Sequence, residues 1–105
     1  MKQDTLVNIY VQGTTGHADD NGVWVADESL VTSTYCFIEP YSQEKAKYKY
    51  GVDVECNRRV FIDHEEPLLK VGMIMRTNTK EYEIKAIPWD YRHMELLVLM
   101  KDSVA

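Results

Sequence analysis

Short apolar-rich segments alternate with compact polar connections through the second half of the chain. Four such segments have strand length and a high content of β-branched or aromatic residues. They cover residues 60–63, 71–76, 81–87 and 94–100. No connection between them is long enough for a substantial helix. The pattern therefore predicts a meander of antiparallel strands.

The first half of the chain reads as extended segments around a single helix. Residues 5–11 and 30–39 favour strands, and residues 23–26 are expected to form a second strand or an irregular segment. Residues 51–57 alternate apolar and polar positions, as a half-buried strand requires. Between them, Ser42 can cap a helix over residues 43–50, and Gly51 can close it in a left-handed conformation. This is the only helix that we predict.

The last strand is apolar on both faces. One face carries Met94, Leu96, Val98 and Met100, and the other carries Leu97 and Leu99. Such a strand is central in a sheet, lies in a closed barrel with outer cover, or contacts another chain, which makes Leu97 and Leu99 candidate subunit-interface residues. Since closure removes unpaired strand edges, we expect a mainly β single domain over residues 1–105, a small β-barrel or rolled antiparallel sheet with one short helix.

A glycine-rich stretch follows the first strand and holds no large apolar side chain. It predicts a long solvated loop that is a candidate channel or interface loop, mobile or ordered by something outside the chain. Its residues are Gln12, Gly13, Thr14, Thr15, Gly16, His17, Ala18, Asp19, Asp20, Asn21 and Gly22.

Composition excludes several classes of protein. The chain has 105 residues, 45% of them apolar, and 12 basic against 17 acidic side chains give a net charge of −5. The surplus of acid disfavours tight nonspecific capture of phosphate backbones and a sequence-reading DNA binder. The longest apolar run, residues 96–100, is too short to cross a bilayer, and from the polar start we expect no signal peptide. We expect synthesis in a cytoplasm and no membrane partner.

Two cysteines, Cys36 and Cys56, both lie in strand-like segments. Cysteine favours cores and cytosolic disulfides are scarce, so we expect two reduced, mostly buried thiols, with a bridge as the alternative.

Two clusters of titratable residues suggest chemistry only weakly. His17, Asp19 and Asp20 have metal-ligand types, but a glycine-rich loop holds ligands poorly before a metal arrives. The acidic and histidine residues at 63–66 diverge in a turn, and His93 stands alone. No nucleophile elbow, phosphate loop, zinc-protease or dinucleotide motif occurs. We therefore expect no enzyme, no metal and no cofactor.

Aromatic and basic residues gather between residues 41 and 59. Tyrosines at 35, 41, 48 and 50 with Trp24, Trp89 and Tyr91 could stack single-stranded bases, and Lys45, Lys47, Lys49, Arg58 and Arg59 supply local positive charge. The alternative function is therefore an OB-like or SH3-like binding module for nucleic acid or peptide. The default for such aromatics is a small core or a subunit contact.

The order of these features is similar to that of a known family. YCFIEPYSQEKAKYKYGVDVECNRRVFID followed by LKVGMIMRTNTKEYEIKAIPWDYRHMELLVLM resembles the head-tail joining or head-completion proteins of tailed bacteriophages, also labelled stopper or minor capsid proteins. The likeness covers residues 30–100. It includes the Glu-Pro-Tyr turn, the helix closed by Gly51, the hairpin, and Trp89-Asp90 before the apolar last strand.

The resemblance implies a small β-barrel in the virion of a phage or prophage, at the head-tail interface. It implies a homo-oligomeric ring beneath the portal that closes the DNA channel and offers a surface to the tail. The partners would be a portal or adaptor protein and a tail-completion protein, and double-stranded DNA would pass without sequence-specific binding. Because such rings need their platform, a monomer in isolation is compatible with this expectation. No catalytic residue is implied.

Overall fold

The computed structural model describes residues 3–18, 21–22 and 24–101, with the backbone path alone for residues 12–18 and 24–28. Six strands and one helix follow one another in the order β1 (Thr5–Ala18), β2 (Trp24–Pro40), α1 (Gln43–Tyr50), β3 (Arg58–Ile62), β4 (Ile74–Arg76), β5 (Glu81–Trp89) and β6 (Met94–Lys101).

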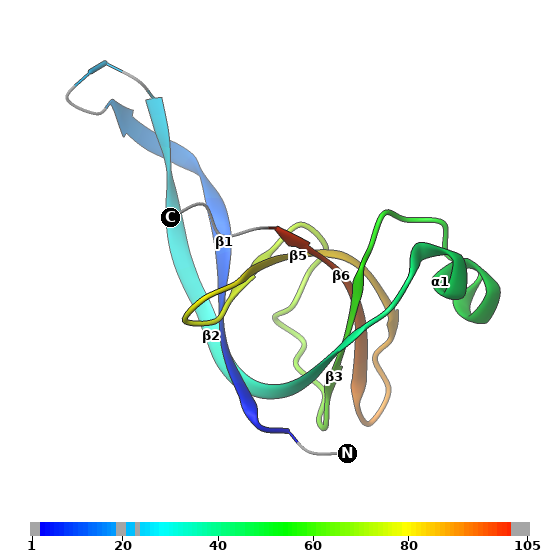
Figure 1. Cartoon of the computed structure of the whole chain (residues 1–105). Helices are drawn as coiled ribbons and strands as arrows, with labels where there is room; N and C mark the ends of the chain where they lie inside the picture. The colour runs from blue at the N-terminus through cyan, green and yellow to red at the C-terminus, as the bar shows by residue number, and fades with distance from the viewer. Residues whose placement is uncertain (1–2, 19–20, 23, 102–105) are drawn as a thin grey trace.

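The strands form a closed barrel in the order β1-β2-β3-β6-β5-β4, and every neighbouring pair is antiparallel (Figure 1). The predicted mainly β barrel with one short helix is therefore confirmed. The turn predicted between residues 76 and 81 joins β4 to β5, where Thr77 N donates to Lys80 O at 2.9 Å.

Side chains fill the interior of the barrel. The inward positions of the strands alternate with outward ones, so that one apolar face of each strand reaches the core. The core contains Val7, Ile9, Cys36, Val60, Ile62, Met75, Ile84, Leu96 and Val98. A barrel packed in this way has no lumen, which matters for any function that involves a channel.

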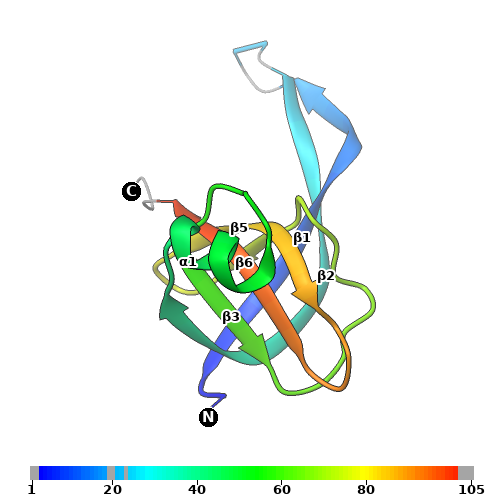
Figure 2. The ribbon, with the colours of Figure 1, turned by 90° about the vertical axis from the view of Figure 1, so that its right-hand side faces the viewer.

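Helix α1 forms as predicted, between the cap and the glycine. Ser42 Oγ accepts from Lys45 N at 3.1 Å, and Gly51 has φ 69°, a left-handed conformation that glycine adopts at least cost. The helix lies over the outer face of β3 and β6 (Figure 2). There Ala46 and Tyr41 pack with Leu97 in a second apolar cluster outside the barrel.

The strand predicted over residues 51–57 is wrong. This segment belongs to no sheet; Asn57 anchors its end, since its N donates to Val98 O at 3.1 Å and its O accepts from Tyr41 N at 3.1 Å. Its predicted alternation of burial is present: Val52, Val54 and Cys56 pack into the cluster around Leu97. The barrel is already closed, so no sheet edge is open to a seventh strand.

The loop predicted from Gln12 to Gly22 is largely strand: residues 12–18 belong to β1. β1 continues to Ala18 and pairs with β2 through Gln12↔Glu28 and Ala18↔Trp24, with an irregularity between Gln12 and Gly16. Asn21 and Gly22 are the described part of the turn, and Gly22 has φ 79°. This arm projects from the barrel (Figure 1), and the molecule measures 46 × 25 × 25 Å. Backbone pairing needs no apolar side chains, so apolar content alone could not reveal the arm.

Candidate functional site

A chain of hydrogen bonds crosses the outer surface of the barrel beside α1. Tyr50, the last residue of α1, donates to the Glu95 carboxylate and accepts from Arg59 Nη1 at 3.1 Å. Arg59 also donates to the Glu39 carboxylate, with Nε at 2.8 Å from Oε1. His93 Nε2 lies 2.9 Å from Glu95 Oε2. The helix, β2, β3 and β6 thus meet in one polar network.

Strand register explains how these residues meet. Glu39 of β2 and Arg59 of β3 are direct cross-strand partners. Glu95 pairs with Phe61 on β3. The Arg59 guanidinium lies 4.2 Å from the centre of the Tyr41 ring and 4.5 Å from that of Phe61. A planar guanidinium stacks well on aromatic rings. Arg59 therefore links Tyr41, just before α1, to Phe61 of the barrel, and it also pairs with Glu39.

The network shifts the pKa of several members. Burial and the hydrogen bond to Glu95 raise the pKa of Tyr50 to about 12, against the opposing effect of Arg59. Burial alone would raise the pKa of the Glu95 carboxyl, but the hydrogen bonds from Tyr50 and His93 outweigh it, so this pKa lies below its ordinary value. For Arg59, burial would lower the pKa, but hydrogen bonds to Tyr50 and Glu39 outweigh it and raise the pKa. Around neutral pH, a neutral tyrosine therefore bridges a cation and a carboxylate.

We expect the stability of the protein to fall as pH rises from about 9 to about 12. Burial raises the pKa of the Cys36 thiol from 9.0 to about 12, and that of Tyr50 rises from 10.0 to about 12. Both folded-state pKa values lie above the unfolded ones, so their contribution is full below pH 9 and is lost as the unfolded chain releases protons. Urea unfolding at about pH 8 and about pH 11 measures the loss.

A matched pair of variants isolates the part due to Tyr50. Tyr50→Phe should flatten the pH dependence above pH 10, whereas Tyr48→Phe should leave it unchanged, because Tyr48 is 94% exposed. An unchanged slope in Tyr50→Phe would contradict this assignment.

The predicted base-stacking platform is only partly present. Tyr41 is buried, and Arg59 is taken up by Glu39 and two aromatic rings. Tyr48 and the three lysines of α1 are exposed and form a basic helix surface. The other predicted aromatics that are exposed are Tyr35, Trp89 and Tyr91; the Trp24 side chain lies outside the described part of the chain.

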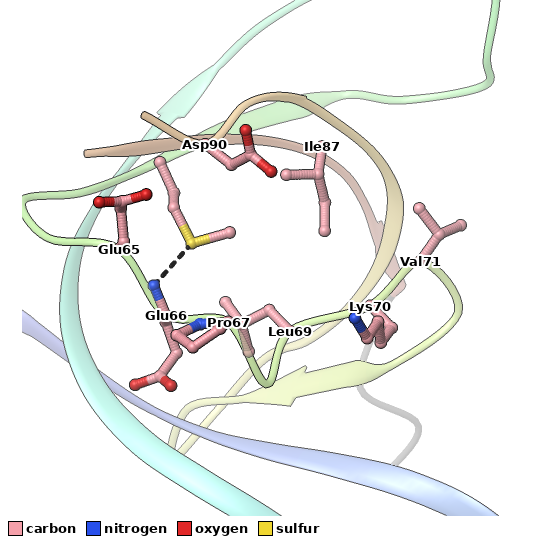
Figure 3. A pocket seen from close by; sticks show the side chains of 9 residues that line it. Glu65, Glu66, Pro67, Leu69, Lys70, Val71, Ile87 and Asp90 are labelled. Carbon is pink, nitrogen blue, oxygen red and sulfur yellow. Dashed lines mark hydrogen bonds between the residues drawn. The ribbon is translucent and has the colours of Figure 1, made fainter. Parts of the chain in front are cut away.

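An acidic pocket lies between the β3–β4 and β5–β6 connections. It has a volume of about 430 Å³. Asp90 and Ile87 line one wall, opposite Pro67 and Leu69, and Glu65 lies at one end (Figure 3). Glu66 N donates a hydrogen bond to the sulfur of Met94 at 3.1 Å, which is the dashed line in Figure 3. This bond ties the β3–β4 connection to the start of β6. The pocket joins buried apolar groups to a rim that carries three carboxylates, Glu65, Glu66 and Asp90, and one lysine, Lys70.

The residues weighed as metal ligands do not converge in the described structure. Among residues 3–18, 21–22 and 24–101, no group of three or more His, Cys, Asp or Glu side chains is placed to hold a metal ion. Asp63 and His64 form a pair, with Oδ1 and Nδ1 2.8 Å apart. The predicted cluster of His17, Asp19 and Asp20 lies outside what is described, because the His17 side chain and both aspartates are not placed.

The two leucines predicted at a subunit interface differ in exposure. Leu97 is 0% exposed, since α1 and residues 52–56 of the same chain cover it. Leu97 therefore cannot contact a partner while α1 is docked. The second face of β6 is apolar because α1 and residues 52–56 cover it. Leu99 is half-buried and stays a predicted interface residue.

The remaining predictions concern the thiols and the membrane. Cys36 and Cys56 are free and buried, as predicted. In the part of the chain that the structure describes, no helix has the length and apolar character to cross a membrane.

Sequence reasoning missed the Tyr50 network. Tyr50 and Glu95 are 45 positions apart, and no local motif links them. Knowledge of the β2–β3 register would have paired Glu39 with Arg59, because both are outward positions on adjacent strands.

Comparison with solved structures finds the same architecture in protein SF1141 from Shigella flexneri 2a, a structural-genomics target known from its solution structure. The two superpose with a TM-score of 0.66, and the match covers 97% of this chain and 96% of that one. The sequences are 13% identical, so the likeness concerns the fold. No family model and no curated protein matches this chain.

Proposed function

We propose that the protein is a structural component of the head-tail connector of a tailed phage, present in the virion or encoded by a prophage. In this role it assembles as a ring beneath the portal, closes the DNA channel and provides a surface for the tail. The observation that carries the proposal is the order of elements over residues 30–100, which resembles the head-completion family, combined with the closed small barrel and single helix that the family implies.

The filled interior of the barrel restricts where DNA could pass in such a connector. Its interior is filled by side chains such as Ile9, Ile84 and Leu96, so DNA would pass between copies and not through one barrel. A ring of barrels around a common axis supplies that passage, because each copy lends the same pair of surfaces to its neighbours. The acidic surplus of the chain favours sliding of DNA over capture.

The projecting arm of β1 and β2 also fits an assembly role. Residues 11–18 and 24–30 extend away from the barrel as a two-stranded ribbon (Figure 1). Two-stranded ribbons are marginally stable alone, so contact with the portal, the tail or a neighbouring copy would stabilise this arm.

Gene disruption tests the proposal. When the gene is disrupted in the phage or prophage that carries it, we expect DNA-filled heads and free tails, with few joined particles in electron micrographs. Expression of the intact gene from a plasmid should restore joining. Normal infectious virions in the disrupted lysate would contradict the proposal.

A second candidate, a module that binds nucleic acid or peptide, is favoured by one observation. Lys45, Lys47 and Lys49 lie exposed on α1 beside the exposed Tyr48 ring. Titration with labelled single-stranded oligonucleotide at low salt tests it, since electrostatic binding is strongest there. The absence of binding at micromolar concentration would remove this candidate.

A further inference from the structure

Helix α1 presents an aromatic side chain framed by positive charge. Tyr48 is 94% exposed. Lys45 and Lys49 lie on the same helix face, and both are exposed. Neither lysine forms an ion pair with a side chain in the described parts of the chain, whereas Lys47 approaches Asp53 at 3.9 Å. Lys49 Nζ lies 5.5 Å from the centre of the Tyr50 ring. Tyrosine rings are enriched at protein interfaces and often anchor them.

The acidic pocket presents the complementary chemistry. Leu69 and Met94 are buried, each 3% exposed, and contribute apolar surface to it. Glu65 and Asp90 are exposed at its rim, and no ion pair joins either to a basic side chain in the described residues. Glu66 and one lysine, Lys70, also line the pocket, so acidic side chains outnumber basic ones there by three to one. Val71, 60% exposed, extends the apolar surface outward. The pocket therefore suits an apolar ring that brings positive charge with it.

Helix α1 and the pocket lie on different sides of the barrel. The helix lies over β3 and β6, whereas the loop after β3 and the β5–β6 hairpin, which border the pocket, lie to its right in Figure 2. Tyr48 does not fill the pocket of its own chain, because its ring is almost wholly exposed.

We infer that Tyr48 of one copy docks in the acidic pocket of the next copy, with Lys45 and Lys49 beside Glu65 and Asp90. Such a head-to-tail contact uses two different surfaces, so it repeats from copy to copy and closes as a ring when the rotation allows. The inference deepens the proposed connector function by naming the contact that builds the ring. Its evidence is the complementarity of these two surfaces.

A second copy accounts for both surfaces better than nucleic acid does. A phosphate backbone could bind the lysines of α1, but the carboxylates at 65 and 90 would repel it. Nucleic acid would therefore leave the pocket unexplained. A neighbouring copy engages the exposed ring, two lysines that form no ion pair in the described structure, and the mainly acidic rim in one contact.

Site-specific photo-crosslinking of the full chain tests the contact even when it is weak. With Tyr48→p-benzoylphenylalanine at high protein concentration and low salt, we expect a covalent dimer on irradiation. The linked peptide should fall within residues 64–71 or 87–94. The dimer yield should drop about tenfold when Glu65→Lys and Asp90→Lys are added, because two rim ion pairs become repulsive.

Two comparisons make the outcome decisive. Tyr35→p-benzoylphenylalanine, at another exposed tyrosine, should give little dimer. A position-48 yield no higher than this control, or crosslinks outside the pocket, would overturn the inference, and so would capture of an added oligonucleotide by position 48 in place of the second copy. Failure here combined with blocked tail joining after gene disruption would remove the contact alone and leave the connector function standing.

Discussion

A Leu97→Ala variant is expected to lose about 2–5 kcal/mol of unfolding free energy. Leu97 is 0% exposed and lies between the barrel and the cluster of Tyr41, Ala46 and Cys56. Truncation removes apolar contacts on both sides and leaves a cavity, since the barrel and the helix cannot fully close the gap. Urea unfolding followed by circular dichroism measures the loss.

Leu99→Ala is the matched control. Leu99 is on the same strand and the same face but is half-buried, so its truncation should cost less than about 1 kcal/mol. Equal losses in the two variants would contradict the view that α1 of the same chain covers the second face of β6.

An Arg59→Leu variant is expected to lose about 2–3 kcal/mol of unfolding free energy at neutral pH. The substitution leaves the Glu39 carboxylate without its cation and the Tyr50 hydroxyl without a donor. It also removes the stacking of the guanidinium on the Tyr41 and Phe61 rings. This expected loss is smaller than that for removing one partner of a fully buried ion pair, because the Glu39 side chain is 27% exposed and water can solvate it. Chemical denaturation compared with the parent chain measures it.

Two further variants separate charge from geometry at this position. Arg59→Lys keeps the charge, but an ammonium group cannot bond Glu39 and Tyr50 as the planar guanidinium does. Its loss of unfolding free energy should therefore lie between zero and that of Arg59→Leu. Adding Glu39→Leu to Arg59→Leu should recover part of the stability, since no carboxylate is then left unpaired. A loss below about 0.5 kcal/mol in Arg59→Leu would show that the network does not stabilise the fold.

Local signals in the sequence predict most of the barrel. Period-two alternation and short polar turns locate β3, β4, β5 and β6, and Ser42 with Gly51 bounds the helix. The same alternation over residues 51–57 misleads, because it reports alternating burial and not pairing with a neighbouring strand. The arm is missed for the opposite reason, since its strands pair through backbone hydrogen bonds without an apolar pattern.

The candidate surfaces depend on which strands are neighbours. Tyr50, Arg59 and Glu95 meet because β3 lies beside β6 and α1 covers both. The acidic pocket likewise joins residues near 66 to residues near 90, which the sequence separates by two strands. Such contacts follow from sheet order, which alternation within one strand does not specify.

In vitro complementation tests the connector role most directly. Lysates from the disrupted gene, containing filled heads and free tails, are mixed with the purified protein, and plaque-forming particles are counted. The account predicts that infectivity returns in proportion to added protein. Leu97→Asp should restore none, because a carboxylate at this fully buried position is expected to unfold the chain. Disrupted lysates that are already fully infectious would contradict the connector role. It would also be contradicted if the folded protein left the titre unchanged and a plasmid restored the titre only by supplying another gene product.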